Sequence, residues 1–134
     1  MIAVDSSAVI AILRAEPEEQ VFIDALVAAG AACMSAVSLQ ETSMVLAGRH
    51  GTAADWLPLD DFIRRLGMEI VPHDTVLARL AGEAFLRFGK GRHPARLNCG
   101  DCASYALARA RSIPLLFKGA DFVRTDIIPA QLVP

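Results

Sequence analysis

Four acidic residues occupy positions where a carboxylate could take part in chemistry: Asp5, Glu41, Asp101 and Asp121. Asp5 directly follows a short apolar run, and Asp121 follows another such run after a three-residue turn. Glu41 lies on an otherwise apolar helical stripe, where an unpaired carboxylate would be costly. Asp101 lies in the first turn of the helix that follows a basic loop. If these segments belong to one sheet, all four acids gather at one edge of it.

Carboxylates gathered in this way repel one another unless a cation sits among them. Mg²⁺ and Mn²⁺ are hard divalent ions that suit carboxylate and water ligands. Such an ion can orient a water molecule, lower its pKa and neutralise charge on a phosphoryl group. The pattern therefore favours metal-assisted phosphodiester hydrolysis, with Mg²⁺ as the cofactor and Mn²⁺ as a substitute.

Each acid also has a structural explanation, which the spacing alone leaves open. Asp5 could cap a helix, although the two serines that follow it already offer caps, and Glu41 could lie on the surface. Asp101 could complement the dipole of its helix, and Asp121 could open an Asx-turn. Because the chain has nine Asp and six Glu, chance combinations of acids are numerous.

Short apolar stretches alternate with helical patterns along the chain. We expect strands at residues 2–4, 31–34, 68–71 and 114–117, with 127–128 as a candidate for a fifth. We expect helices at residues 6–13, 17–30, 35–48, 52–66, 74–88 and 98–111. Such alternation calls for a parallel sheet covered on both faces, whose ligands bind at the carboxyl ends of the strands. At 134 residues we expect one domain, residues 1–134, with a three-layer α/β/α architecture and a sheet of four to five strands.

The composition excludes several classes of protein. Apolar residues make up 54% of the chain, which is too many for a disordered segment. The longest stretch without a polar side chain, residues 26–34, is far shorter than the ~20 residues of a membrane span, and no signal peptide is visible. An odd number of cysteines, three, indicates a reducing compartment, the cytoplasm. The apolar surplus indicates a surface that a second chain covers.

The net charge of −2 is unevenly distributed. Residues 79–118 contain eight basic and two acidic side chains, a net +6, which leaves −8 for the rest of the chain. Such asymmetry is typical of a face that binds a polyanion. Arginines scattered around a solvated surface would explain it equally well. If the polyanion is RNA, the expected contacts are Lys90, Arg92, Arg96 and Lys118.

The four acids fall within four ordered blocks that resemble the PIN-domain ribonucleases, and among them the VapC-type toxins of toxin–antitoxin pairs. The blocks are Ile2–Ala8, Ser38–Glu41, Leu97–Cys102 with Tyr105–Ala108, and Leu115–Phe122 with Thr125–Ile127. Together they cover nearly the whole chain. One departure is Ala120, which stands where the family often has Asn or Asp, so an auxiliary contact from that position is missing.

The resemblance implies a metal-dependent endoribonuclease in which a metal-activated water attacks the phosphorus atom of RNA. The implied metal ligands are Asp5, Glu41, Asp101 and Asp121, and the implied accessory residues are Ser7, Asn98 and Asp126. The resemblance also implies a cognate VapB-like antitoxin that blocks the site, and a homodimer. We expect these two interfaces along the first two helices and residues 56–66.

Two other functions have sequence features in their favour. A receiver-type phospho-acceptor domain also has a parallel sheet, strand-end acids, Mg²⁺ and a lysine near its last strand, for which Lys118 would stand. It needs an acidic pair after the first strand, however, whereas Ser6 follows Asp5. Cys99 and Cys102 form a CxxC motif like that of thiol–disulfide oxidoreductases, but here a long basic loop separates the motif from any strand.

Overall fold

The sheet is parallel throughout, and its four strands lie in the order β3-β2-β1-β4. A computed structural model describes all 134 residues of the chain. The strands are β1 (Ile2–Val4), β2 (Ala32–Ser35), β3 (Glu69–Val71) and β4 (Leu115–Leu116). Ala3 pairs with Cys33 on one side and with Leu115 on the other. Strand β1 is therefore interior, and the residue that follows it lies at the middle of the carboxyl edge.

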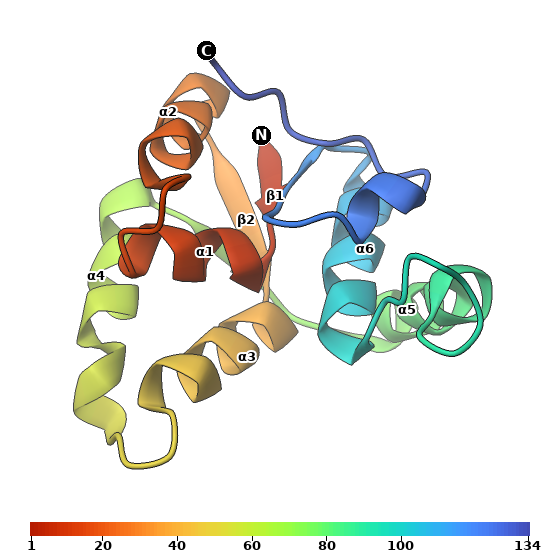
Figure 1. Ribbon diagram of the computed structural model, residues 1–134, viewed down its shortest axis with the longest axis horizontal. Coiled ribbons are helices and arrows are strands. Elements are labelled where there is room, and N and C mark those ends of the chain that lie inside the picture. Colours follow the sequence, from red (N-terminus) through yellow and green to blue (C-terminus); the bar gives the residue numbers. More distant parts are fainter.

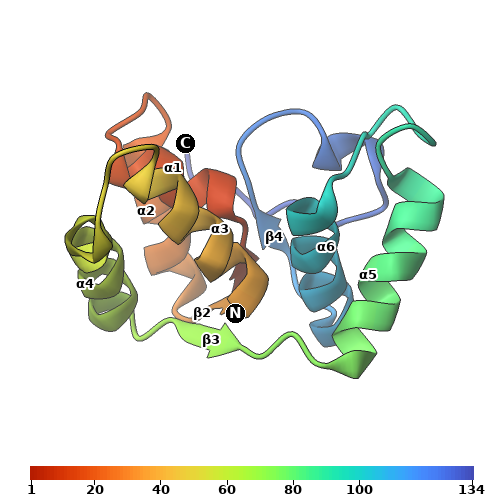
Figure 2. The ribbon, with the colours of Figure 1, turned by 90° about the horizontal axis from the view of Figure 1, so that it is seen from below.

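Six α-helices and two 3₁₀ turns connect the strands. They are α1 (Ser6–Leu13), α2 (Glu19–Ala29), α3 (Ala36–Ala47), η1 (Ala53–Trp56), α4 (Leu57–Leu66), α5 (Thr75–Phe88), α6 (Cys99–Arg111) and η2 (Phe122–Arg124). Figure 1 shows α1, α2 and α4 on one side of the sheet and α5 and α6 on the other, and Figure 2 shows the same separation from below. The predicted three-layer α/β/α architecture is confirmed. None of the helices is long and apolar enough to cross a bilayer.

Each face of the sheet has its own apolar cluster, because alternate residues of a strand point to opposite faces. Val4 and Met34 pack with the residues of α1, α2 and α4. Ala3 and Cys33 pack with those of α5 and α6. Because both faces are covered, the strands are apolar without the alternation expected of a half-exposed sheet.

Most of the predicted helix boundaries are found in the structure. Asp74 and Asn98 cap α5 and α6 through their side chains, and Gly30 and Gly67 end α2 and α4 with φ of +71° and +57°. The start of α1 differs from the expectation in one respect. Its N-cap is Asp5, whose side chain accepts from a backbone N–H of the first turn, rather than either of the serines that follow.

The candidate fifth strand at residues 127–128 is not formed. The Leu115 N–H donates to the Ile128 carbonyl at 2.9 Å, but the pairing remains an isolated bridge between Leu115 and Pro129. Proline has no N–H with which to continue a ladder, and β4 is itself only two residues long. The sheet therefore has four strands.

Candidate active site

Asp5 is the most buried of the four acids, with 2% of its surface exposed. Its Oδ2 accepts hydrogen bonds from the Ser7 backbone N–H at 3.0 Å and from Ser7 Oγ at 2.6 Å. Its Oδ1 accepts from Ser104 Oγ at 2.6 Å. Asp5 is thus a helix cap, as one reading of the sequence allowed, and the same three donors orient its carboxylate at the carboxyl end of β1.

Ser104 is a part of the site that sequence reasoning missed. Because an ionised carboxylate only accepts, Ser104 Oγ donates its single proton to Asp5 and accepts from Ser38 Oγ, 3.0 Å away. A fully buried chain of hydroxyl groups therefore runs from α3 through α6 to Asp5. No sequence pattern indicates this, since a serine in an alanine-rich helix is ordinary and its partner lies 99 positions away.

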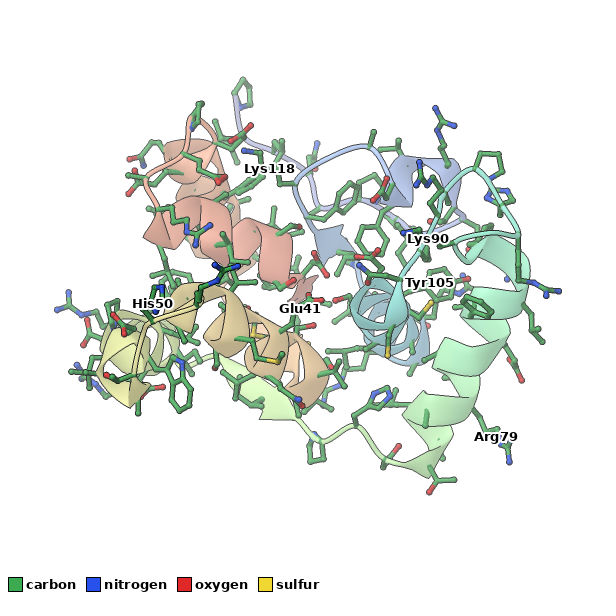
Figure 3. All side chains as sticks on the ribbon, turned by 60° about the horizontal axis from the view of Figure 1, so that its bottom comes forward. Glu41, His50, Arg79, Lys90, Tyr105 and Lys118 are labelled. Carbon is green, nitrogen blue, oxygen red and sulfur yellow. The ribbon has the colours of Figure 1, made fainter.

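Glu41 comes from α3, which packs against both α1 and α6 (Figure 3). Ser6 Oγ donates a hydrogen bond to Glu41 Oε1. On its other side the carboxylate packs against Gly100 of α6, where an added Cβ would lie 2.8 Å from Cδ of Glu41. Real Cβ atoms essentially never come so close. The missing side chain at Gly100 is therefore what lets Glu41 lie beside Asp101.

Gly100→Ala should displace Glu41 and weaken the binding of a divalent ion by about tenfold or more. The helix itself should tolerate the change, because alanine has a higher helix propensity than glycine. Calorimetric titration with Mn²⁺ measures the affinity. Gly82→Ala in α5 is the matched control, since a Cβ there meets nothing within 4 Å. Unchanged affinity in Gly100→Ala, or an equal loss in the control, would contradict this role of Gly100.

Asp101 lies in the first turn of α6, where it forms a reciprocal capping box with Asn98. The Asp101 N–H donates to Asn98 Oδ1 at 2.9 Å, and the Asn98 N–H donates to Asp101 Oδ2 at 3.0 Å. Burial raises the pKa of the Asp101 carboxyl to about 6, and the negative charges of Asp5, Glu41 and Asp121 also raise it, against the hydrogen bond from Asn98. Asp5, Glu41 and Asp121 therefore all lie within electrostatic reach of Asp101.

Asp121 lies after β4, just before η2, where it is exposed and has no hydrogen bond to its side chain. It lines a polar hollow of about 340 Å³ together with Asn98, Asp101, Lys90 and Arg96. Two carboxylates and two cationic side chains thus share one hollow. The accessory residue Asn98 belongs to it through its capping box with Asp101.

Ser7 connects the carboxyl ends of β1 and β4. Its Oγ donates to Asp5 and accepts from the backbone N–H of Lys118 at 3.0 Å. The Lys118 ammonium group lies 2.8 Å from Glu16 Oε2 and 3.1 Å from Glu18 Oε2. Those two carboxylates pair with the ammonium group, and the role of Lys118 as an RNA contact stays a prediction.

Asp126 belongs to a separate network. Its Oδ1 accepts from the Tyr105 hydroxyl at 2.6 Å and its Oδ2 accepts from Arg87 at 3.1 Å. The hydrogen bond from Tyr105, followed by that from Arg87, holds the pKa of Asp126 below its usual range. This carboxylate therefore ties the segment after η2 to α5 and α6, and its role as an accessory acid stays a prediction.

The donor set at the carboxyl edge suits a hard divalent ion. Its candidate ligands are carboxylate oxygens, with no thiol or imidazole among them. No three of these groups converge closely enough to enclose an ion by themselves. Such openness fits Mg²⁺, which keeps several water ligands and is usually bound through one or two carboxylates. Burial is the main cause of the raised pKa of Asp101, and the negative charges of Asp5, Glu41 and Asp121, which add to it, are the charges that this ion would neutralise.

The CxxC motif does not have the structural setting of a redox site. Cys99 and Cys102 are both free thiols, the first exposed and the second buried, and burial followed by the negative charge of Asp101 raises the pKa of Cys102 to about 11. The helix α6 that carries them follows α5 and the basic loop, with no strand between, whereas redox motifs of this kind begin a helix next to a strand. The oxidoreductase alternative is therefore not supported.

Comparison with known sequences shows the family of this chain. The model of the PIN domain family matches residues 2–128. Ribonuclease VapC30 of Mycobacterium tuberculosis (strain H37Rv) is 40% identical over 129 residues, which are 96% of this chain and 98% of that protein. Ribonuclease VapC28 of the same strain is 43% identical over 125 residues, with 92% and 93% of the two chains covered.

Solved structures share the fold at lower sequence identity. Mycobacterium tuberculosis VapC20, described as a sarcin–ricin loop cleaving toxin, has a TM-score of 0.74 and 22% identity over 96% of this chain and 97% of that chain. VapBC2 of Rickettsia felis, bound to a DNA fragment from its promoter, has a TM-score of 0.76 and 16% identity over 96% of each. The chain belongs to the PIN domain family, among the VapC ribonucleases. The receiver-type alternative is not supported.

Proposed function

We propose that this protein, as a single PIN domain of residues 1–134, is a metal-dependent endoribonuclease and the toxin of a VapBC-type toxin–antitoxin pair. The observation that carries the proposal is the match of the PIN domain family over residues 2–128. It is joined by the placement of Asp5, Glu41, Asp101 and Asp121 around the carboxyl edge of the parallel sheet. These four residues would be both the metal ligands and the catalytic residues. Relatives named ribonucleases support RNA as the substrate.

The protein's own contribution to the reaction is to position and charge the site. A Mg²⁺ or Mn²⁺ ion bound among the four acids, directly to one or two of them and through water to the others, would supply a water of lowered pKa and a positive charge beside the scissile phosphate. Hydrogen bonds fix three of the carboxylates, and their donors are Ser6, Ser7, Ser104 and Asn98. Asp121 has no such partner and lies on an exposed loop, so it is free to adjust to the bound ion and the substrate.

Exposed apolar side chains support the proposal of a protein partner. Val27 on α2 is 69% exposed near the C-terminal end of α4, and Leu57 at the N-terminal end of α4 is 65% exposed, with Trp56 before it exposed as well. We assign the first two helices and residues 56–66 to the antitoxin, and a structural relative from Klebsiella pneumoniae is described as a toxin–antitoxin complex. A homodimer in the cytoplasm completes the proposal, and the three free thiols fit a reducing compartment.

The test is incubation of the purified protein with structured RNAs, transfer RNA and ribosomal RNA among them, in Mg²⁺ or in EDTA. We expect discrete cleavage sites with Mg²⁺ and none in EDTA, and sequencing of the new RNA ends names the substrate. Cleavage that persists in EDTA would contradict metal dependence. Intact RNA under all conditions, from a protein that is folded and free of antitoxin, would contradict the ribonuclease itself.

A further inference from the structure

The loop between α5 and α6, residues 89–97, is a rigid platform beside the four acids. The Lys90 N–H donates to the Leu97 carbonyl at 3.0 Å, and the Leu97 N–H donates to the Phe88 carbonyl at 3.0 Å. His93 closes the loop further, because its Nδ1 accepts from a backbone N–H within the loop at 3.0 Å. The two ends of the loop are therefore joined, and its side chains project from a fixed frame.

Arg96 is held outward by its neighbours in this loop. Ala95 and Leu97 on either side of it are fully buried, whereas Arg96 is exposed. Its backbone φ is +54°, a left-handed conformation that favours glycine. Glycine would adopt this conformation without strain. The presence of a long cationic side chain here therefore indicates that its guanidinium group has a function.

Lys90 and Arg96 both line two neighbouring hollows. The first is the hollow of about 340 Å³ that they share with Asp101 and Asp121. The second, of about 510 Å³, is lined by the loop itself, residues 90–94 and Arg96. Because both cations line both hollows, a polyanion that extends from the acids across the loop must pass them.

The other basic side chains of residues 79–118 are engaged or lie elsewhere. Ion pairs with carboxylates neutralise Arg87, Arg111 and Lys118. Arg79 near the start of α5 and Arg109 in the last turn of α6 lie at the helix ends far from the connecting loop, and Figure 3 shows Arg79 pointing outward. Arg92 Nε donates to the Leu86 carbonyl at 3.2 Å. The basic segment is therefore not one face, and Lys90 and Arg96, which form no ion pair, are the cations left at the acids.

We propose that Lys90 and Arg96 form a clamp for a backbone phosphate of the RNA substrate, next to the phosphate that is cut. This proposal rests on the proposed function and adds to it where the RNA strand runs. Four carboxylates repel a phosphodiester, and two unpaired cations in the same hollow offset that repulsion. Both are positioning residues. Because phosphate contacts carry no sequence information, the clamp fixes the strand without selecting the bases.

The clamp is tested by binding without cleavage. Fluorescence anisotropy measures the Kd of the full-length protein for a labelled single-stranded RNA oligonucleotide in EDTA, over a series of NaCl concentrations. Arg96→Gln and Lys90→Gln should each weaken binding several-fold and reduce the slope of log Kd against log[NaCl] by about 0.7, the value for one lost phosphate contact on a single strand. Arg96→Lys should keep the wild-type slope. Arg79→Gln, the matched control, removes an exposed arginine on α5 far from the loop and should change neither quantity.

The clamp is wrong if both Arg96→Gln and Lys90→Gln keep the wild-type slope, or if Arg79→Gln loses as much slope as they do. With a DNA oligonucleotide of the same sequence, the two variants should lose as much slope as they do with RNA. A loss of slope seen only with RNA would show that the contact is not to phosphate. In a cleavage assay Arg96→Gln should raise KM and leave kcat nearly unchanged. Failure of the two proposals is distinguishable. If the protein cleaves no RNA but the variants show these slope changes, the clamp stands and the proposed ribonuclease activity is wrong. If the protein cleaves RNA but the variants keep the wild-type slope, the ribonuclease activity stands and the clamp is wrong.

Discussion

Asp5→Asn should lower the rate of RNA cleavage by at least about a hundredfold while the protein stays folded. The amide lacks the negative charge that a divalent ion needs, but it has nearly the same shape. Its oxygen can accept from Ser7, and its NH₂ group can donate to Ser104, whose proton then turns toward Ser38. The measurement is the initial rate of cleavage of a labelled RNA in Mg²⁺, with the melting temperature as the check of folding.

Asp60→Asn is the matched control for this experiment. Asp60 is exposed on α4 and forms no ion pair, so the same chemical change there should leave the cleavage rate unchanged. If wild type and Asp5→Asn cleave equally, Asp5 has no part in the reaction and the assignment of the metal site is wrong. Equal losses in both variants would likewise count against a specific role of Asp5.

Asp101→Asn should stabilise the protein at neutral pH when no divalent ion is present. The pKa of Asp101 is about 6 in the folded protein, against about 3.9 in an unfolded chain. Because the folded pKa is the higher one, the stability that Asp101 contributes is fully present below about pH 4 and is lost as the pH rises through about 6. Asparagine stays uncharged at every pH and can still accept from the Asn98 N–H. The expected gain is about 2 kcal/mol, or several degrees in melting temperature.

The effect of Mg²⁺ should run in the opposite direction. An ion that binds only the folded state stabilises it in proportion to the logarithm of its concentration over Kd, and Asp101→Asn removes one charged ligand. Wild type should therefore gain more stability from Mg²⁺ than the variant does. Thermal melts at acid and neutral pH, in EDTA and in Mg²⁺, measure both effects.

Glu83→Gln serves as the control for these melts, because Glu83 is exposed on α5 and forms no ion pair. Neither its melting temperature in EDTA nor its response to Mg²⁺ should differ from wild type. A Mg²⁺ stabilisation of Asp101→Asn as large as that of wild type would contradict the role of Asp101 as a ligand. A lower melting temperature of the variant in EDTA would contradict the repulsion among the acids.

Much of the fold could be predicted because it depends on neighbours along the chain. The apolar run before Asp5, the capping residues Asp74 and Asn98, and the glycine that ends α2 are each recognised within one turn or one strand. Alternation of strands and helices then requires a parallel sheet, and a parallel sheet puts the strand-end acids on one edge. The misplaced cap of α1 shows the limit of this reasoning, since three successive residues there can all act as caps.

The contacts within the site could not be predicted, because they join segments far apart in the sequence. Ser104 meets Asp5 only because α6 packs beside β1, and Glu41 approaches Asp101 only because Gly100 has no side chain. Whether a charged side chain is paired also depends on residues that are distant in the sequence. Lys118 looks like an RNA contact in the sequence, but the loop before α2 brings two glutamates to its ammonium group.

The sequence by itself determined which residue types could bind a metal and at which edge of which kind of sheet they would lie. Only the tertiary structure decided which hydroxyl groups orient the acids, which cations remain unpaired beside them, and how strongly the four carboxylates oppose one another's charge. The physical reason is the range of the interactions involved. Helix caps and apolar periodicity act between residues a few positions apart, whereas hydrogen bonds and ion pairs form between whichever groups the packed elements bring together.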